Sequence, residues 1–182
     1  MALRLRRPER ADLDVIVDWM GDPEFRMFMF GDSEPKPMHM GQQALSLLGG
    51  VQSLPSATAG QLVLDEPARG PVGLASFQEL SWRNRWCVVA AYLAAEHRSD
   101  ELINDAVQTL LTHCFDELNL HRAGMRVEAL DTAVQRACER LGAKRELLMR
   151  GYVMRDGRPA DVYAYGVLRA EFDAARAGKR DN

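Results

Sequence analysis

The residues best suited to chemistry lie in the segment from Glu96 to Ile103, where a predicted strand gives way to a helix. His97 is a candidate general base, because an imidazole can exchange a proton near neutral pH. Ser99 is a favourable N-cap, and the unpaired amides of a helix N-terminus can bind an anion. The first turn of this helix, however, carries its own carboxylates on Asp100 and Glu101. Each would repel a phosphate charge ~4 Å away by roughly 1–4 kcal/mol, so the sequence predicts weak anion binding here.

Other arrangements that support catalysis do not occur in the sequence. The four histidines show no metal-ligand spacing with one another or with the three cysteines, which argues against a zinc site, and we expect no metal. No serine lies in the glycine-flanked turn of hydrolases, and neither a phosphate-binding loop nor a dinucleotide fingerprint is present. The odd number of cysteines, Cys87, Cys114 and Cys138, predicts reduced thiols and a reducing compartment such as the cytoplasm.

Length and composition indicate one compact domain. The chain has 182 residues, of which 47% are hydrophobic and 27% charged, with a net charge of −3. We expect a single domain over residues 1–170 and a charged, alanine-rich tail over 171–182 that forms a frayed helix. The balanced charge argues against a nucleic-acid partner, and the lack of a long apolar run argues against a signal peptide or a membrane-spanning segment.

Apolar patterning predicts an α+β domain with a mixed sheet. Short apolar runs, some of them alternating with polar residues, are typical of strands and occur at residues 3–5, 61–64, 72–80, 86–93, 121–129, 147–154 and 162–168. Helical spacing occurs at 13–20, 42–48, 103–118 and 134–141. The middle strands suit an antiparallel meander, and 86–93, 103–118 and 121–129 could form a parallel crossover unit. The turn from Asp156 to Pro159 predicts a closing hairpin.

The segment 20–40 differs from the rest of the chain, because methionines and phenylalanines are mixed there with prolines and a glycine. Such a segment could line an acceptor pocket or form a lid, since methionine adapts to irregular shapes. The alternative is a segment that only covers the core.

Several strings occur in an order that carries a family resemblance. They are the opening from Leu5 to Pro8, the run from Cys114 to Arg122, the pair Leu141-Gly142 and the run from Asp161 to Tyr165. Together they resemble the GNAT superfamily of N-acetyltransferases, especially its branch of ribosomal-protein alanine N-acetyltransferase-like proteins. The resemblance covers nearly the whole chain. It implies a GNAT-like, mostly antiparallel seven-stranded sheet with a central βαβ unit and flanking helices.

The resemblance also implies a donor, acetyl-CoA or another acyl thioester, with its pantetheine between the strands 86–93 and 121–129. The acyl group would pass directly to an amine, with no covalent enzyme intermediate. The residues implied at the donor are Tyr92, Leu93 and Ala94 beside the pantetheine, Arg98, Ser99, Asp100, Glu101, Leu102 and Ile103 at the phosphates, and Asp131 at the next helix. Asp131 could instead be an ordinary N-cap.

One part of the family pattern is altered. The family's phosphate loop has an arginine followed by alternating glycines, and glycine lets a phosphate approach the main chain. Arg98 fits this pattern, but Ser99, Glu101 and Ile103 replace the glycines. The resemblance therefore implies a degenerate loop with weak or absent pyrophosphate binding. An acyl carrier protein is an alternative donor, because its phosphopantetheine arm has only one phosphate.

Amine acylation needs a base for the amine and an acid for the departing thiolate. The candidate bases are Glu79, at the end of the third strand, and His97. Glu79 could equally be a solvated surface residue. The resemblance implies that Cys138 stands where many GNAT proteins have a tyrosine that protonates the departing thiolate. Cys138 lies on the apolar face of its predicted helix, which favours a buried structural role instead.

These observations lead to one functional prediction and one alternative. The prediction is an N-acyltransferase that moves an acetyl or other acyl group from a CoA or carrier-protein thioester to a primary amine of a small molecule or a protein N-terminus. The alternative is a non-catalytic or altered-chemistry GNAT-fold protein that uses the cleft for another ligand or partner. The surface between Trp82 and Trp86 could serve a homodimer, although nothing in the sequence ranks it above a solvated surface.

Overall fold

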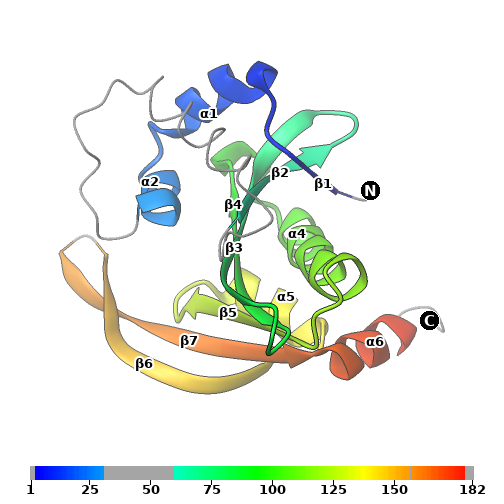
Figure 1. Ribbon diagram of the computed structural model, residues 1–182. Coiled ribbons are helices and arrows are strands. Elements are labelled where there is room, and N and C mark those ends of the chain that lie inside the picture. The colour runs from blue at the N-terminus through cyan, green and yellow to red at the C-terminus, as the bar shows by residue number, and fades with distance from the viewer. Residues whose placement is uncertain (1–2, 31–59, 156, 179–182) are drawn as a thin grey trace.

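The computed structural model describes residues 3–30, 60–155 and 157–178, which form a seven-stranded sheet with helices on both faces (Figure 1). The strand order is β1-β2-β3-β4-β5-β7-β6. The strands are Arg4–Arg6 (β1), Gly60–Glu66 (β2), Gly70–Ser81 (β3), Trp86–Leu93 (β4), Arg122–Glu128 (β5), Lys144–Arg155 (β6) and Arg158–Leu168 (β7). Neighbouring strands pair antiparallel except β4 and β5, which are parallel. This confirms the predicted α+β fold with a mixed, mostly antiparallel sheet.

The helices agree with the sequence patterns in most places. They are α1 (Leu13–Trp19), α2 (Pro23–Phe30), α4 (Asp100–Thr112), α5 (Thr132–Arg140) and α6 (Arg169–Gly178), with 3-10 turns at Arg10–Asp12 and Ala95–His97. The predicted helix 103–118 is α-helical only to Thr112 and continues as a π-helical turn, His113–Glu117. The predicted helix 42–48, and the methionine-rich segment beyond Phe30, lie outside the described residues.

The central unit β4-α4-β5 positions the rest of the site. Ser99 caps α4 as predicted, with its hydroxyl accepting a hydrogen bond from the Leu102 amide. The apolar stripe of α4, including Ala106 and Leu110, is buried against the sheet. The crossover also brings the free thiols of Cys87 and Cys114 to 3.5 Å, a proximity that their sequence spacing does not indicate.

A second, smaller core fixes α1 and α2 to the opposite face of the sheet (Figure 1). The Tyr92 ring of β4 lies 5.8 Å from the Trp19 ring and 4.9 Å from the Phe25 ring, both edge-on. Aromatic pairs in this geometry contribute about 0.5–1.5 kcal/mol beyond the burial of their area. The Tyr92 hydroxyl also donates a hydrogen bond to Asp22 Oδ2 (2.8 Å). The start of α2 is therefore held against the end of β4.

The C-terminal segment forms a helix, α6, as predicted, but its first turn is packed in the core and not frayed. Phe172 of α6 is fully buried, and its ring lies 5.4 Å from the Phe115 ring. The pattern was hard to recognise because Phe172 is the one large apolar residue of α6, among alanines and charged residues. The helix is part of the core through this single anchor.

A buried carboxylate near the N-terminus supports a stability prediction. Asp12 is 3% exposed and accepts two hydrogen bonds from Arg6 (2.7 and 2.8 Å) and one from the Glu9 amide (2.7 Å). Burial by itself raises the pKa of Asp12, but the hydrogen bonds from Arg6 and Glu9 and the charge of Arg6 outweigh it, so the pKa is lowered. We expect Asp12→Asn to lower the free energy of unfolding by about 2 kcal/mol at pH 7.

The pH dependence of that loss follows from the lowered pKa. A carboxyl with a lowered folded-state pKa stabilises the fold fully above its unfolded pKa of about 3.9, and this contribution is lost as the pH falls further. Urea unfolding of the unchanged protein and of Asp12→Asn at pH 7 and pH 3 measures the contribution of this carboxylate to the free energy of unfolding. We expect the difference between the two to shrink at pH 3; an unchanged difference would contradict this assignment.

Candidate active site

The strands β4 and β5 separate partway along their length. They pair at only four positions, from Trp86↔Arg122 to Val89↔Met125, although both strands continue beyond this point. The Ala94 amide donates a hydrogen bond to the carbonyl oxygen of Val72 in β3. Tyr92, two residues earlier in β4, is paired with Leu74, two residues later in β3. The main-chain N–H and C=O groups of Tyr92 and Ala94 therefore point toward β3. Because these directions alternate along a strand, the groups of Ala91 and Leu93 face the widening gap. An extended ligand could therefore pair with Ala91 and Leu93.

The gap opens into a cleft of about 780 Å³. Its walls come from the separated parts of β4 and β5, the cleft-facing side of α4, the first turns of α2, the β5–α5 connection and the last residue of β6. The side chain of Ala91 is exposed within it, although its neighbours on the same face of β4, Val89 and Leu93, are buried. The volume and the mostly apolar lining suit a small-molecule site.

At one end of the cleft Arg98 is held by two carboxylates. Its guanidinium forms ion pairs with Glu24 of α2 and with Asp131 at the start of α5, the second at 3.2 Å. Asp131 also caps α5, since its side chain accepts from the Val134 amide, as its alternative role predicts. The three side chains are about a third to a half exposed, and such pairs typically contribute 0–1 kcal/mol. An anionic ligand could therefore displace either carboxylate from Arg98.

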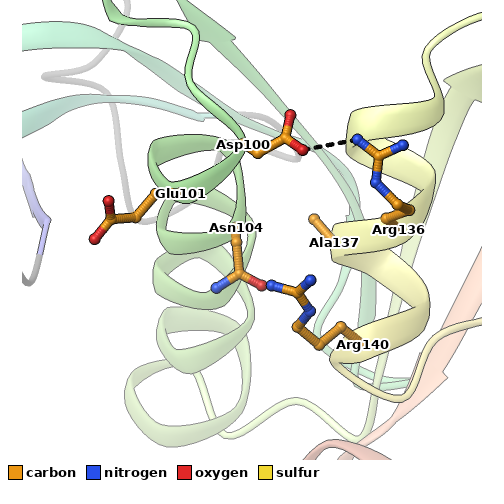
Figure 2. A pocket seen from close by; sticks show the side chains of 6 residues that line it. All are labelled: Asp100, Glu101, Asn104, Arg136, Ala137 and Arg140. Carbon is orange, nitrogen blue, oxygen red and sulfur yellow. Dashed lines mark hydrogen bonds and ion pairs between the residues drawn. The ribbon is translucent and has the colours of Figure 1, made fainter.

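The other residues expected at the phosphates divide into two groups. Asp100 forms an ion pair with Arg136 of α5 (2.8 Å), beside a shallow pocket of about 250 Å³, and Figure 2 shows Glu101 turned away from this pair. Leu102 and Ile103 are 7% exposed and belong to the core, although Ile103 also lines the cleft. The hydroxyl of Ser99 is engaged in capping.

The candidate acid–base residues do not converge on the cleft. Cys138 is fully buried, its thiol lies 3.6 Å from Met125 Sδ, and burial raises its pKa to about 12. It does not line the cleft, so the structure gives it no route to a departing thiolate. His97 lies in the turn before α4, also outside the cleft lining. Glu79 reaches the cleft only through its ion pair with Arg126 (2.7 Å).

The structure adds charged residues that sequence reasoning missed. Arg126 and Glu128 of β5 line the cleft on the α2 side, and Arg155, at the end of β6, binds both oxygens of Glu128 at 2.5–2.9 Å. Alternation along β5 does signal that Arg126 and Glu128 share a face opposite the core residues. The Arg155 contact has no local signal, because the two partners are 27 residues apart.

The described part of the chain offers neither a metal centre nor a membrane-spanning helix. Among residues 3–30, 60–155 and 157–178 no cluster of histidine, cysteine and acidic side chains could hold a metal ion. The helices of those ranges also include no span of the length and hydropathy needed to cross a bilayer.

Comparison with known proteins identifies the fold and the family. The family model described as "Acetyltransferase (GNAT) domain" matches residues 2–144. An uncharacterised N-acetyltransferase of Bacillus licheniformis, p20, is 29% identical over 175 residues, covering 93% of this chain and 94% of the relative. A second relative, the uncharacterised N-acetyltransferase YoaA of Bacillus subtilis, is 22% identical over 98 residues and covers 54% of this chain and 55% of its own.

Solved structures share the same fold at low sequence identity. The spermidine N-acetyltransferase of Vibrio cholerae, solved with CoA and spermine, superposes with a TM-score of 0.77. It is 20% identical and covers 93% of this chain and 97% of its own. A structure described as a probable acetyltransferase has a TM-score of 0.75 at 19% identity, covering 92% and 93% of the two chains.

Proposed function

The chain belongs to the GNAT acetyltransferase family, and from this premise we propose that it transfers the acetyl group of acetyl-CoA to a primary amine. The observation that supports this proposal best is the cleft at the separation of β4 and β5. There the main chain of Ala91 and Leu93 can pair with the amides of pantetheine, as β5 pairs with β4 further down. Arg98 lies at the end of the same cleft, where it can meet a phosphate.

The reaction needs little from the enzyme beyond orientation and proton transfer. The amine nitrogen forms a bond to the thioester carbonyl carbon, the carbon–sulfur bond breaks, the amine loses one proton and the sulfur gains one. The cleft would align the two substrates, and such alignment alone can supply about 7–11 kcal/mol of the barrier. Of the carboxylates that line the α2 side of the cleft, Glu128 lies on β5, where the strands separate, and it could accept the amine proton directly or through water.

A thiol-release assay tests the function directly. The purified protein is mixed with acetyl-CoA and a panel of amines: amino acids, peptides with free N-termini, and polyamines. We expect amine-dependent release of CoA and a product heavier by one acetyl group. Donor binding without transfer to any amine would instead favour the alternative of a non-catalytic relative, and no donor binding would exclude acetyl-CoA as the ligand.

We also propose that the acidic first turn of α4 weakens donor binding. Glu101 lies where the donor's phosphates would meet the helix N-terminus, and the repulsion of one charge pair amounts to roughly 1 kcal/mol. We expect Glu101→Gln to lower the Kd for acetyl-CoA by about fivefold at low salt, and by less at high salt. Isothermal titration at two ionic strengths measures both effects.

Glu117→Gln is the matched control for this change. Glu117 is exposed in the π-helical turn that ends the same helical run, so its substitution alters the net charge equally, far from the proposed phosphate site. We expect its Kd to equal that of the unchanged protein. If Glu101→Gln and Glu117→Gln change the Kd for acetyl-CoA equally, the position of Glu101 in the first turn of α4 is not what weakens donor binding.

Several partners and properties expected from the sequence stay predictions. They are a protein N-terminus as the acceptor, an acyl carrier protein as the donor, a cytoplasmic location, and a homodimer formed through the surface between Trp82 and Trp86. For the last of these, the structure leaves Trp82 53% exposed, whereas Trp86 is half-buried. The peptides of the amine panel test the first of these predictions, and the oligomeric state in solution tests the last.

A further inference from the structure

The charges on the α2 side of the cleft are arranged in pairs. Among the described residues that line this part of the cleft, Glu128 is bound by Arg155 and Glu24 by Arg98, while Asp22 accepts the hydroxyl of Tyr92. Arg126 in turn binds Glu79. The described residues on the α2 side of the cleft therefore carry mostly paired positive and negative charges, and not an excess of one sign.

This pairing is unfavourable for a polycation. A polyamine binds where carboxylates are available, but each carboxylate of an ion pair here brings an arginine that would repel a second ammonium group. A ligand with both an ammonium and an anionic group avoids this conflict, because it can give each partner of an opened pair a new partner of opposite charge.

The Glu128–Arg155 pair is the one best built for such an exchange. Both of its side chains line the cleft, and they are 25% and 35% exposed, so the pair is accessible to a ligand. Partly exposed pairs contribute little to stability, so opening one in favour of two equivalent contacts costs little. The guanidinium of Arg155 already binds a carboxylate with two nitrogens, which is the geometry in which arginine recognises this group.

The contact distance restricts the ligand further. Glu128 and Arg155 touch at 2.5–2.9 Å, so a ligand that opens the pair with little movement of either side chain must have its own two charges close together. An α-amino acid meets this requirement, since its amine and carboxylate are attached to one carbon. A peptide N-terminus does not, because its nearest carboxyl is an amide. In the lining of the same cleft, Met27, Phe28 and the 83% exposed Leu130 offer apolar surface for a side chain.

Resting on the proposed acetyl transfer, we infer that the acceptor is a free α-amino acid with an apolar side chain, whose carboxylate is held by Arg155 and whose amine is held by Glu128. The bound ammonium gives up one proton to solvent, directly or through Glu128, before the amine attacks the thioester carbon. The second proton leaves the nitrogen on acylation and goes to the departing CoA sulfur, so the product keeps the carboxylate and has no ammonium charge. Glu128 then has no cationic partner on the ligand and can return to Arg155, which favours product release.

Matched acceptors test the inference. L-leucine and leucinamide differ only in the carboxylate, while an alanine-initiated tripeptide and spermidine represent the two competing acceptor classes. We expect kcat/KM for leucine to exceed that for leucinamide, the tripeptide and spermidine by about tenfold or more, the range for one charge-assisted contact. Equal or better use of any of these three would overturn the inference.

Arg155→Gln and Arg158→Gln make the matched pair of variants. Each removes one positive charge from the same hairpin, but Arg158 does not line the cleft. We expect Arg155→Gln to bring the leucine-to-leucinamide ratio to about one through a higher KM for leucine, and Arg158→Gln to leave the ratio unchanged. A ratio that survives Arg155→Gln, or that falls equally in both variants, would contradict the assignment.

Binding separates this inference from the proposed function. The shift in melting temperature with acetyl-CoA reports the donor site alone, and titration of leucine into the protein with CoA reports the acceptor site. Donor binding without leucine binding or acetylation overturns the inference and leaves the donor assignment standing. Absence of donor binding overturns the proposed function itself, and with it the acceptor assignment that rests on it.

Discussion

Replacing Ala91 with phenylalanine should lower kcat/KM for acetyl transfer by about 100-fold or more, a loss of roughly 2.7 kcal/mol of transition-state stabilisation. Ala91 lies on β4 beyond its last pair with β5, and its side chain is exposed inside the cleft between β4 and α4. A phenyl ring there would occupy the path proposed for pantetheine. The loss should appear as weaker donor binding, measured by titration with acetyl-CoA alongside steady-state kinetics.

The exposure of Ala91 also makes the variant informative. Because the side chain is not packed in the core, the larger residue should fold normally, and the melting temperature without ligand checks this. Ala91→Ser is the size-matched control and should retain donor affinity within about twofold. If Ala91→Phe folds and binds acetyl-CoA normally, the donor does not lie between β4 and α4.

The largest stability effect is expected for Gly73→Ala in β3. A Cβ at this position would lie 2.0 Å from the carbonyl oxygen of Tyr92 and 3.0 Å from Leu93 Cα, both of them backbone atoms of β4. The strands must move apart to accept it, and we expect a loss of about 3 kcal/mol or more in the free energy of unfolding. Because the displaced residues form one wall of the cleft, donor affinity should fall as well.

Gly70→Ala separates this close approach from the general cost of replacing a glycine. Gly70 begins the same strand with φ +84°, and a Cβ there would have no atom within 4 Å. Its replacement should cost only the about 1–2 kcal/mol of a left-handed conformation. Denaturant unfolding of both variants measures the two losses in the free energy of unfolding. Equal losses would show that the close approach of β3 to β4 at Gly73 has no special cost.

Much of the fold could be predicted from local sequence patterns. Short apolar runs and alternating apolar residues located all seven strands, and the N-cap Ser99 located the start of α4, because these signals depend only on near neighbours. Phe172 shows the limit of this approach. A single aromatic residue gives no periodicity, so its burial could be found only from the tertiary structure.

The site was predictable in outline and less so in its contacts. The family resemblance implied a cleft between β4 and β5. Which main-chain groups face it depends on the β3–β4 register, which turns those of Ala91 and Leu93 toward the gap and those of Tyr92 and Ala94 toward β3. The partners of Arg98 lie on α2 and α5, and those contacts depend on how distant elements pack. Such long-range ion pairs have no signature in sequence spacing.

The most direct test of the central claim is a titration of acetyl-CoA into the purified protein and into Ala91→Phe. The account predicts one donor molecule per chain for the unchanged protein. At a concentration of about 100 times Kd the donor should add about 2.7 kcal/mol to the free energy of unfolding. For Ala91→Phe, with donor affinity about 100-fold lower or weaker still, it predicts a gain of no more than about 0.4 kcal/mol at the same concentration. Equal binding by both proteins, or binding by neither, would contradict a donor site in the opening between β4 and β5.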